Sequence, residues 1–417
     1  MRRRRRIVII QKSIPAYRVP FYLLLRRELE ARGIQLTLVC GDSVGDDKFK
    51  ADRGQVDWAH YRPHRHLRVG RRELIWQPVL DLAEGADLVI VEQASKLLVN
   101  YVFLALQSRS TSPAVALWGH GANLQRHTAS RIGEAIKVLA SRRARWWFAY
   151  TESTRQLLIT RGIPNSRITV VQNSTDTVAL RRDMADIADH ELRSCRAVWQ
   201  STPGRTAVFI GGLYAEKRLR FMVQACAIAA EHLPHFRLLI AGDGPDRAVA
   251  EELAKAHGFV MFLGRVDGRE KAALLQIADC IVMPGLVGLA IVDSFAAEAP
   301  LITTSVPYHS PEIDYLEDGV NGILVRDPYS PSEFGKAVRD VMTDELLIAG
   351  LRTGCRIAAE RYTNEEMVRR FADGVELALE ATGSDSESGR HRLNRPGFPG
   401  GSKPWKGGSS LDRVDFG

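Results

Sequence analysis

Short apolar runs alternate with amphipathic stretches along most of the chain. In the first half the apolar runs cover residues 6–10, 35–40, 88–91, 114–118, 147–150 and 168–171. A strand that is buried on both faces of a parallel sheet has such a continuous apolar run. The segments between the runs are long enough for crossover helices, so the pattern predicts βαβ units and a parallel sheet.

Two amphipathic segments of the first half are predicted as helices. One runs from Val19 to Arg32, with Gly33 just past its end, where a glycine commonly terminates a helix. The other runs from Ala129 to Ala144.

The second half repeats the alternation. Strands are predicted at residues 206–210, 237–241, 260–263, 280–283, 301–303 and 322–325, with helices at 219–232, 247–257, 271–277 and 292–297. Each half therefore has the pattern of its own doubly wound sheet. The fold class expected is α/β, with two Rossmann-like domains.

The length of 417 residues is more than one ordinary core accommodates, which agrees with two domains. We place an N-terminal domain at residues 1–178, a linker region at 179–203 and a second domain at 204–362. A last amphipathic helix is expected at 363–382. Residues 383–417 are rich in Gly, Ser, Arg and Pro and lack apolar periodicity, which predicts a disordered tail.

Composition narrows the class of protein. The five cysteines are scattered and never form a CxxC pair, which argues against a disulfide framework or a zinc site and favours the cytoplasm. No apolar run approaches the ~20 residues of a spanning helix. The run at residues 7–10 follows a basic leader but is too short for a signal peptide, so we interpret it as a buried strand.

Charge is distributed unevenly. Residues 1–182 hold 31 Lys and Arg against 15 Asp and Glu, a net +16, and the remainder is −8. A basic half suggests an anionic partner, and one hypothesis is peripheral contact with the inner face of an anionic membrane. The alternative is a solvated basic surface without a partner.

Four turns after strands of the second half carry candidate chemistry, because ligands of doubly wound sheets bind at the carboxyl ends of strands. The first turn, residues 211–218, contains Gly211, Gly212 and Lys217. Glycines let backbone amides approach an anion, and a lysine can place a point charge on a diphosphate. The alternative is a glycine turn with a surface lysine.

The other three turns are weaker alone. Residues 241–245 hold a short GxG, for which a tight strand-to-helix turn is the better interpretation. Residues 283–296 hold a glycine-bearing loop that leads into a helix containing Asp293, whose carboxylate can accept hydrogen bonds from ribose hydroxyls. The fourth turn spans residues 309–313, followed by residues 318–322 before the last strand.

The ordered set IGGLYAEKR, AGDGP, FLGRV, PGLVGLAIVDSFA, PEI and DGVNGILV resembles the family 4 retaining glycosyltransferases of the GT-B fold, as a divergent subgroup. The resemblance covers most of residues 6–380 and is strongest at 206–326. It implies two Rossmann-like domains that face each other across a cleft, and a nucleotide-sugar donor bound by the second one.

Site residues follow from the resemblance position by position. It implies that Lys217 and the turn at Gly211 and Gly212 hold the donor diphosphate, with Gly212 in place of a family arginine. Backbone at Gly264, Arg265 and Val266 would meet the nucleotide base. The donor loop would comprise Gly285, Leu286, Val287, Gly288 and Leu289, with Asp293 on the ribose; Gly285 stands in place of the first glutamate of an E-x7-E pair.

The first half supplies the other side of the cleft. His120, flanked by glycines after a strand, resembles the family histidine that contacts the donor sugar, and we assign it a catalytic role with Lys217. Arg18 is a candidate in the loop that receives the acceptor. Residues 173–176 resemble a family turn and are interpreted as mainly structural. The histidines of residues 60–66 lie among arginines, which favours a flexible basic loop near the acceptor over a metal site.

The resemblance implies a metal-independent transfer with retention, from a nucleotide sugar to a glycan or lipid-linked acceptor, in glycan, polysaccharide or glycolipid biosynthesis. No cofactor is expected apart from the donor as co-substrate. Three alternatives stay open: a nucleotide-sugar epimerase of the same fold, a non-catalytic nucleotide-sugar-binding protein, and a nucleic-acid binder. The last has no recognisable motif and low aromatic content for stacking, so no nucleic-acid partner is expected.

Overall fold

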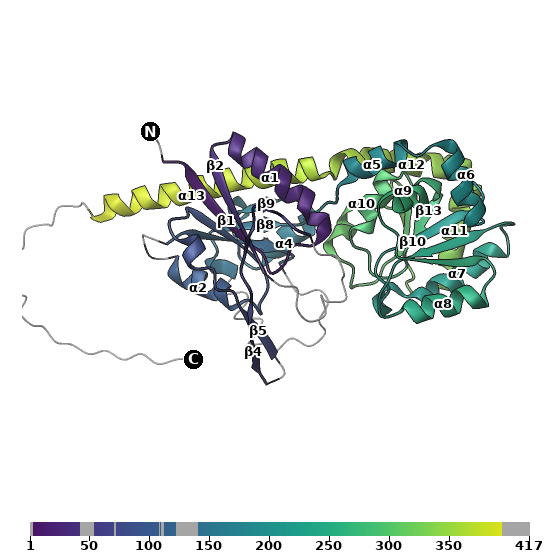
Figure 1. Ribbon diagram of the computed structural model, residues 1–417, viewed down its shortest axis with the longest axis horizontal. Coiled ribbons are helices and arrows are strands. Elements are labelled where there is room, and N and C mark those ends of the chain that lie inside the picture. The colour runs from purple at the N-terminus through teal and green to yellow at the C-terminus, as the bar shows by residue number, and fades with distance from the viewer. Residues whose placement is uncertain are drawn as a thin grey trace, which may run out of the picture.

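The structure, a computed structural model, describes residues 3–41, 54–70, 72–107, 109, 112–121 and 141–393. Two lobes lie side by side, each built on one parallel sheet with helices on both faces (Figure 1). The predicted α/β architecture with two doubly wound domains is confirmed.

The N-terminal lobe contains seven parallel strands in the order β3-β2-β1-β6-β7-β8-β9. Their bounds are β1 (Arg5–Ile10), β2 (Ile34–Cys40), β3 (His60–Tyr61), β6 (Leu88–Glu92), β7 (Ala114–Gly119), β8 (Trp146–Ala149) and β9 (Ile168–Val170). The central strands are fully buried, as their unbroken apolar runs require; Ile7, Val8 and Ile9 have no exposed surface.

Helices cover both faces of this sheet: α1 (Val19–Ala31), α2 (Leu98–Leu106) and α4 (Glu152–Thr160), with short 3-10 turns η1 (Ala16–Arg18), η3 (Asp81–Ala83) and η4 (Asn165–Arg167). Helix α1 ends one residue before its predicted end, and Gly33 has a φ of 73°, the left-handed conformation expected at such an end. Most of the predicted helix at 129–144 lies outside the described residues.

A two-stranded antiparallel hairpin interrupts the first lobe and was not predicted. Strands β4 (Arg65–Val69) and β5 (Arg72–Trp76) form a separate small sheet that projects from the lobe (Figure 1). The prediction of a flexible basic loop at residues 60–66 is therefore wrong. His60 and Tyr61 pair with β2, and Arg65 begins the hairpin. The arginines and histidines of this segment have the composition of a loop, so the sequence did not indicate a strand.

The C-terminal lobe contains six parallel strands in the order β12-β11-β10-β13-β14-β15. They are β10 (Thr206–Ile210), β11 (Arg237–Ala241), β12 (Val260–Gly264), β13 (Cys280–Val282), β14 (Leu301–Thr304) and β15 (Gly322–Val325). Each lies within a residue of its predicted bounds. The order reverses between β10 and β13, which is the switch point where ligands of such sheets bind.

The helices of this lobe are α7 (Leu219–Ala230), α8 (Arg247–Ala256), α9 (Gly268–Ile277), α10 (Ala290–Ala296), α11 (Pro331–Thr343) and α12 (Glu345–Arg361), with 3-10 turns η5 (Ala215–Lys217) and η6 (Pro311–Tyr315). The segment predicted as a linker, 179–203, is also helical. It contains α6 (Asp189–Val198) and most of α5 (Thr177–Ala185), which pack on α9 and α10. Leu180, Ile187 and Trp199 belong to the core of this lobe, so the segment is part of it.

The last helix, α13 (Asn364–Leu393), leaves the C-terminal lobe and runs back along the N-terminal one (Figure 1). Phe371 packs against Phe148 and Trp118 in the core of that lobe, and Arg32, directly after α1, bonds to Asp373 and Glu376. The predicted end at residue 382 and the start of a disordered tail at 383 are wrong, because the helix continues to Leu393. Residues 394–417 lie outside the described part.

Candidate functional site

The turns after β10 and β11 pack backbone against backbone. A Cβ on Gly242 would lie 1.9 Å from the Gly211 carbonyl oxygen, and one on Gly244 would lie 2.3 Å from the Leu213 oxygen. The Leu213 amide donates to the Asp243 carbonyl at 2.9 Å. Both glycines of the AGDGP turn thus have a packing role, which agrees with the tight turn favoured for this motif.

Lys217 of η5 is buried, and its side chain joins the first predicted turn to the third. Its Nζ donates to the Leu286 carbonyl oxygen at 2.5 Å and lies 3.4 Å from the Met283 sulfur. Desolvation lowers the pKa of this amine to about 8, against a smaller opposing effect of Glu216. The Tyr214 ring also lies 5.3 Å from the ammonium, and no carboxylate forms an ion pair with it among the described residues, which leaves its charge available to an anion.

The loop of residues 285–289 is held by backbone contacts. The Leu286 amide donates to the Glu216 carbonyl at 2.9 Å, and the Val287 amide donates to Nδ1 of His309 at 3.0 Å. Since Nδ1 accepts, Nε2 carries the proton and donates to the Thr304 carbonyl at 2.7 Å. His309 is therefore neutral, and desolvation together with Lys217 lowers its pKa.

These bonds reduce the number of amides that a ligand can reach. Leu286 and Val287, both predicted donor contacts, use their N–H groups inside the protein. Among the described residues, the amides of Gly288 and Leu289 have no hydrogen-bond partner. His309 was named in the sequence only as part of the fourth turn; its contact with Val287 depends on two loops that meet only in the folded lobe.

Gly285 explains why the family glutamate is missing. A Cβ at this position would lie 1.9 Å from the Glu216 carbonyl oxygen and 2.8 Å from the Lys217 carbonyl carbon. No side chain fits there without movement of the backbone that carries Lys217. The approach of η5 to this loop and a side chain at position 285 are thus incompatible.

Gly212, which stands where the family has an arginine, is exposed, and a Cβ on it would lie 2.7 Å from the Tyr214 ring. A cation does follow Lys217 directly. Arg218 has a φ of 59° and a ψ of 47°, a left-handed conformation that is uncommon outside glycine. Its guanidinium lies on the Phe221 ring and 3.3 Å from the Pro284 carbonyl oxygen.

Asp293 of α10, the predicted ribose contact, is buried and already has two partners. Its carboxylate forms an ion pair with Lys271 at 2.8 Å and accepts a hydrogen bond from the Thr175 hydroxyl at 3.3 Å. Each oxygen retains a lone pair for a further donor. Neither partner was foreseen, because Lys271 and Thr175 belong to distant segments.

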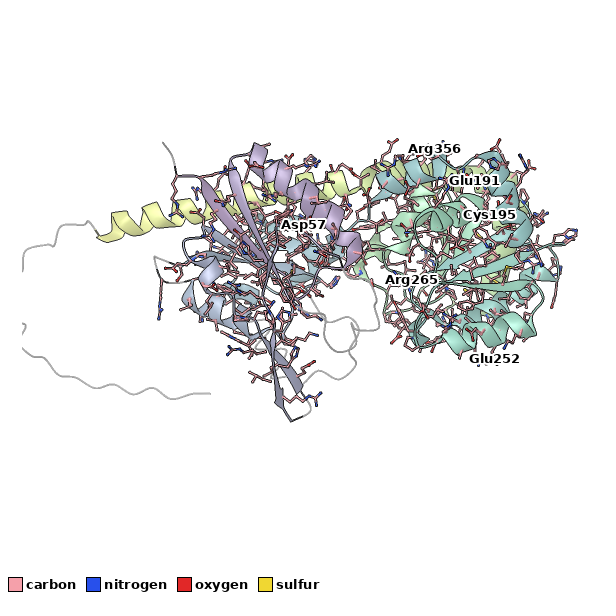
Figure 2. The ribbon with its side chains drawn as sticks, in the orientation of Figure 1. Asp57, Glu191, Cys195, Glu252, Arg265 and Arg356 are labelled. Atoms are coloured by element: carbon pink, nitrogen blue, oxygen red, sulfur yellow. The ribbon has the colours of Figure 1, made fainter. Side chains whose placement is uncertain are left out.

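The predicted base-binding segment lies at the end of β12. Gly264 has a φ of 73°, and its carbonyl accepts from the Gly242 amide at 2.7 Å. Val266 is buried, whereas Arg265 is exposed and bonds to Asp267 at 2.7 Å. Figure 2 shows Arg265 on the side of the C-terminal lobe that faces the other lobe.

His120 follows β7 at the carboxyl edge of the N-terminal sheet. Its ring lies 4.5 Å from the Tyr150 ring, centroid to centroid, and keeps exposed surface. The protein around it nevertheless desolvates the imidazole, which lowers its pKa; Glu312 acts in the opposite direction, and Arg18 adds to the lowering. His120 is thus neutral near pH 7 and can donate or accept a hydrogen bond.

Arg18, the acceptor-loop candidate, is buried where the lobes meet. Its guanidinium donates to Asn173 Oδ1 at 2.5 Å and lies over the rings of Tyr17, Phe21, Trp118 and Tyr150. The Asn173 amide group donates in turn to the buried carboxylate of Glu312 in η6. Arg18 therefore contacts the opposite lobe through Asn173, a placement that does not suit direct contact with an acceptor.

Glu312 is a residue of this region whose role the sequence did not indicate. The motif PEI marked its position only. The backbone N–H of Asn173 donates to the Tyr315 hydroxyl at 2.7 Å, and the backbone N–H of Ser153 donates to Asp314 at 2.9 Å. These contacts tie η6 of one lobe to the other lobe, beside His120. Residues 173–176, interpreted as mainly structural, carry further contacts between segments: Ser174 donates to the Tyr362 carbonyl at 2.7 Å, and Thr175 donates to Asp293.

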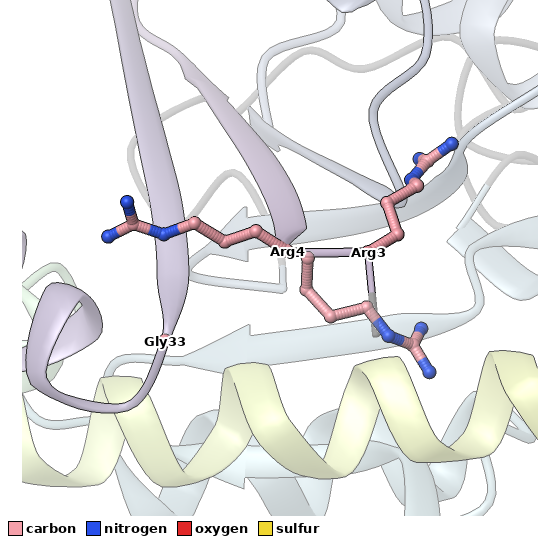
Figure 3. Close-up of a pocket in the computed structure, with 4 residues that line it drawn as sticks. Arg3, Arg4 and Gly33 are labelled. Atoms are coloured by element: carbon pink, nitrogen blue, oxygen red, sulfur yellow. The ribbon is translucent and has the colours of Figure 1, made fainter. Parts of the chain in front are cut away.

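The molecule also has a depression lined by Arg3, Arg4, Arg5 and Gly33 (Figure 3). It lies at the amino end of β1, opposite the edge that carries His120. The labelled arginine side chains point in different directions instead of converging. We do not assign it to the donor, because a diphosphate requires converging donors.

Two family models match this chain. The first, described as a glycosyl transferase 4-like domain, covers residues 21–174, and the second, glycosyl transferases group 1, covers residues 204–344. Together they span most of both lobes. Among the described residues, no helix is both long and apolar enough to cross a membrane.

Named relatives share part of the sequence. An alpha-monoglucosyldiacylglycerol synthase of Acholeplasma laidlawii is 28% identical over 165 residues, which are 38% of this chain and 40% of that protein. A GDP-mannose-dependent alpha-(1-6)-phosphatidylinositol dimannoside mannosyltransferase of Mycobacterium tuberculosis is 29% identical over 218 residues, 48% of this chain and 56% of that protein. The chain thus spans about half the length of these relatives.

Solved structures share the fold. Anabaena HepE in complex with UDP superposes with a TM-score of 0.66 at 15% identity, over 89% of this chain and 99% of that one. A glycosyltransferase from Rickettsia africae gives 0.66 at 13% identity, over 91% and 98%. At such identities the likeness concerns the arrangement of the two lobes.

Proposed function

This chain belongs to the family 4 glycosyltransferases of the GT-B fold, and from that premise we propose that it moves a sugar from a nucleoside diphosphate sugar to an acceptor hydroxyl with retention. The observation that carries the proposal is the placement of Lys217. Its buried ammonium lies against the loop that precedes Asp293, at the switch point of a doubly wound sheet.

The role assigned to Lys217 is stabilisation of the departing diphosphate. In a retaining transfer of this kind the bond from the sugar to the diphosphate breaks as negative charge grows on the phosphate oxygens. A fixed ammonium in a desolvated place stabilises that charge more than it would in water. The amides of Gly288 and Leu289 supply further donors at the same loop.

His120 is assigned to the sugar, from the opposite lobe. A neutral imidazole can hydrogen-bond to a sugar hydroxyl without placing a positive charge beside a developing oxocarbenium ion. The acceptor hydroxyl attacks from the face that the diphosphate leaves, and its proton passes to a phosphate oxygen. The bonds of α13 to Arg32 and the bond of Glu312 to Asn173 connect the two lobes, and so hold the donor side and the acceptor side next to each other.

For the acceptor we propose a glycan or a lipid-linked hydroxyl, with the chain in the cytoplasm and in peripheral contact with an anionic membrane. Support comes from the net +16 of residues 1–182 and from the printed activities of the glycolipid relatives. UDP and GDP are the first nucleotides to examine, since HepE was solved with UDP and one relative depends on GDP-mannose.

The test is nucleotide binding by calorimetry, with UDP and GDP titrated into the protein. Lys217→Ala removes the charge at the phosphates, so we expect nucleotide affinity to fall roughly 10- to 100-fold. Lys255→Ala, an exposed lysine of α8, is the matched control and should bind as the unaltered protein does. Equal affinity of the Lys217 variant and the control would contradict the diphosphate assignment.

A further inference from the structure

We propose that the β4–β5 hairpin is the element that docks this chain on an anionic lipid bilayer. The inference rests on the proposed function. It identifies the surface that would bring the carboxyl edge of the N-terminal sheet, with His120, to a lipid-linked acceptor. Charge counts of the whole lobe do not identify such a surface. The hairpin does so by its position and by the side chains it exposes.

The base of the hairpin is fixed at the carboxyl edge of the N-terminal sheet. His64 bonds through Nε2 to the Lys12 carbonyl at 2.7 Å, in the loop after β1. The Ile75 amide donates to the Lys96 carbonyl at 2.8 Å, in the loop after β6. Because parallel strands end at the same edge, the hairpin rises from the edge that also carries His120 after β7.

One face of the hairpin combines apolar and basic side chains. In the antiparallel register Leu67 lies opposite Leu74, and Arg65 lies opposite Trp76. Residues directly opposite each other share a face. Leu67 is 49% exposed, and the sidechain of Leu74 is half-buried. Tyr61 of β3, before the hairpin, and Leu80, after it, are further exposed large apolar side chains of this region.

The basic groups of the hairpin are not neutralised by its neighbours. Between Arg65 and Trp76 the sequence holds four arginines and a single glutamate, whereas Arg62, just before the hairpin, pairs with Asp81 at 3.0 Å. That glutamate, Glu73, bonds to His66 at 3.0 Å. Arg65 and Arg68 are both exposed, and neither has an ion-pair partner among the described residues. Arg65 therefore places positive charge on the face that carries Leu67, and Arg68 adds charge on the other face, opposite Glu73.

A bilayer satisfies both features at once. Anionic headgroups attract arginines near the surface, and the interface accepts an apolar side chain such as Leu67 beside them. A polyanion such as a nucleic acid or an acidic glycan would use the charge and leave Leu67 in water. An isolated two-stranded hairpin is marginally stable in water, so contact along its free face also stabilises it.

Docking through the hairpin orients the lobe. Five residues per strand give the hairpin a length of about 17 Å. With its tip in the headgroup region, the carboxyl edge of the sheet faces the bilayer, and the loops after β1, β6 and β7 lie within reach of lipid headgroups. A lipid-linked acceptor would then reach the edge with His120 without leaving the membrane.

The experiment is flotation of the full chain with vesicles of phosphatidylcholine mixed with phosphatidylglycerol, and with phosphatidylcholine alone. We expect binding to the mixed vesicles at low salt, and much less to the neutral ones. The double variant Arg65→Glu, Arg68→Glu should weaken binding by about tenfold or more. Leu67→Asp should weaken it several-fold without any change of the arginines.

Matched controls separate the hairpin from general charge. Arg3→Glu, Arg4→Glu makes the same change in net charge at exposed positions of the opposite edge, and should bind within about twofold of the unaltered chain. Leu346→Asp, at a position 87% exposed in the other lobe, controls for the apolar change. Equal loss of vesicle binding in the two double variants would overturn the proposal. Full binding by Leu67→Asp would overturn it as well, because the chain would then bind the vesicles by charge alone, as it would bind any polyanion.

The same proteins also keep this proposal distinct from the proposed function. Affinity for UDP or GDP is measured for each hairpin variant, and it should equal that of the unaltered chain, because the hairpin lies in the lobe opposite Lys217. If the unaltered chain fails to float with the mixed vesicles but binds nucleotide, the docking surface is wrong and the transferase assignment stands. Loss of nucleotide binding by the Lys217 variant alone leaves the docking result unaffected.

Discussion

The two lobes share one architecture, yet their carboxyl edges are built differently. In the C-terminal lobe the turns lie backbone to backbone: Gly242 on Gly211, Gly244 on Leu213, and Gly285 on Glu216. In the N-terminal lobe the corresponding edge carries an inserted hairpin, exposed arginines and an exposed histidine. The N-terminal edge also has close contacts, since a Cβ on Gly41 would lie 2.5 Å from the Arg62 carbonyl oxygen, but it carries in addition the extended basic hairpin.

This difference suits the two substrates proposed. The phosphates and ribose of a nucleotide sugar have a constant shape, so turns held by close packing can fix the few donors that meet them. An acceptor in a membrane lies outside the protein. The carboxyl edge of the N-terminal lobe can approach it when surface charge and apolar side chains bind the bilayer. Function varies where loops are added to a constant frame.

The most severe test of the compact edge is Gly285→Glu, which restores the family residue. Because a Cβ would overlap the Glu216 carbonyl oxygen, we expect a loss of about 3 kcal/mol in the free energy of unfolding and no gain in activity. Thermal or urea unfolding measures it. Gly350→Glu, on exposed α12 with open space around it, is the control and should unfold at or above the usual midpoint. A stable Gly285→Glu variant with raised activity would show that the close contact is not a constraint.

Where the two lobes meet, Glu312→Ala should be the next largest change. It leaves the buried Asn173 amide group without its acceptor and removes the carboxylate nearest to Arg18 in this network, so stability should fall by about 2 kcal/mol. Urea unfolding gives the value. Glu312→Gln retains an acceptor and should lose less, and the exposed Glu360→Ala should change little. Equal stability of Glu312→Ala and Glu360→Ala would show that the contact between the lobes contributes nothing.

A smaller effect is expected from pH on nucleotide binding. The pKa of Lys217 is lowered to about 8 in the free protein, and a bound diphosphate favours the ammonium, which raises the pKa again. The complex therefore takes up a proton above pH 8, and affinity should fall as pH rises past 8, by up to about tenfold per pH unit. Calorimetry with UDP or GDP between neutral and alkaline pH measures it. Lys217→Met, which cannot titrate, should bind more weakly with a flat profile; a flat profile in the unaltered chain would mean that the amine does not meet the phosphates.

Much of the fold could be predicted because the strands of both sheets are buried on both faces. Such strands need unbroken apolar runs, and β10, β11 and β15 lie where those runs predicted them. The hairpin was missed for the opposite reason. Strand β4 is exposed on both faces, so its positions carry arginine and histidine, and no alternation of apolar and polar residues marks it as a strand.

The site divides in the same way. Lys217, Asp293 and His120 could be named from local motifs, and all three lie at the carboxyl edges of their sheets. Their partners could not be named. Leu286 and Met283 beside Lys217, Lys271 beside Asp293, and Tyr150 beside His120 come from segments that meet only after folding.

The sequence by itself determined the strands of the two sheets, the motifs that follow those strands and the residue types at the donor turns. Burial and turn chemistry are local requirements on each segment. Only the tertiary structure decided that Gly285 leaves no room for a glutamate, that Arg18 joins the lobes through Asn173 and Glu312, and that the basic hairpin stands on the edge with His120. Those facts depend on distances between segments remote in the chain, and such distances are set by packing.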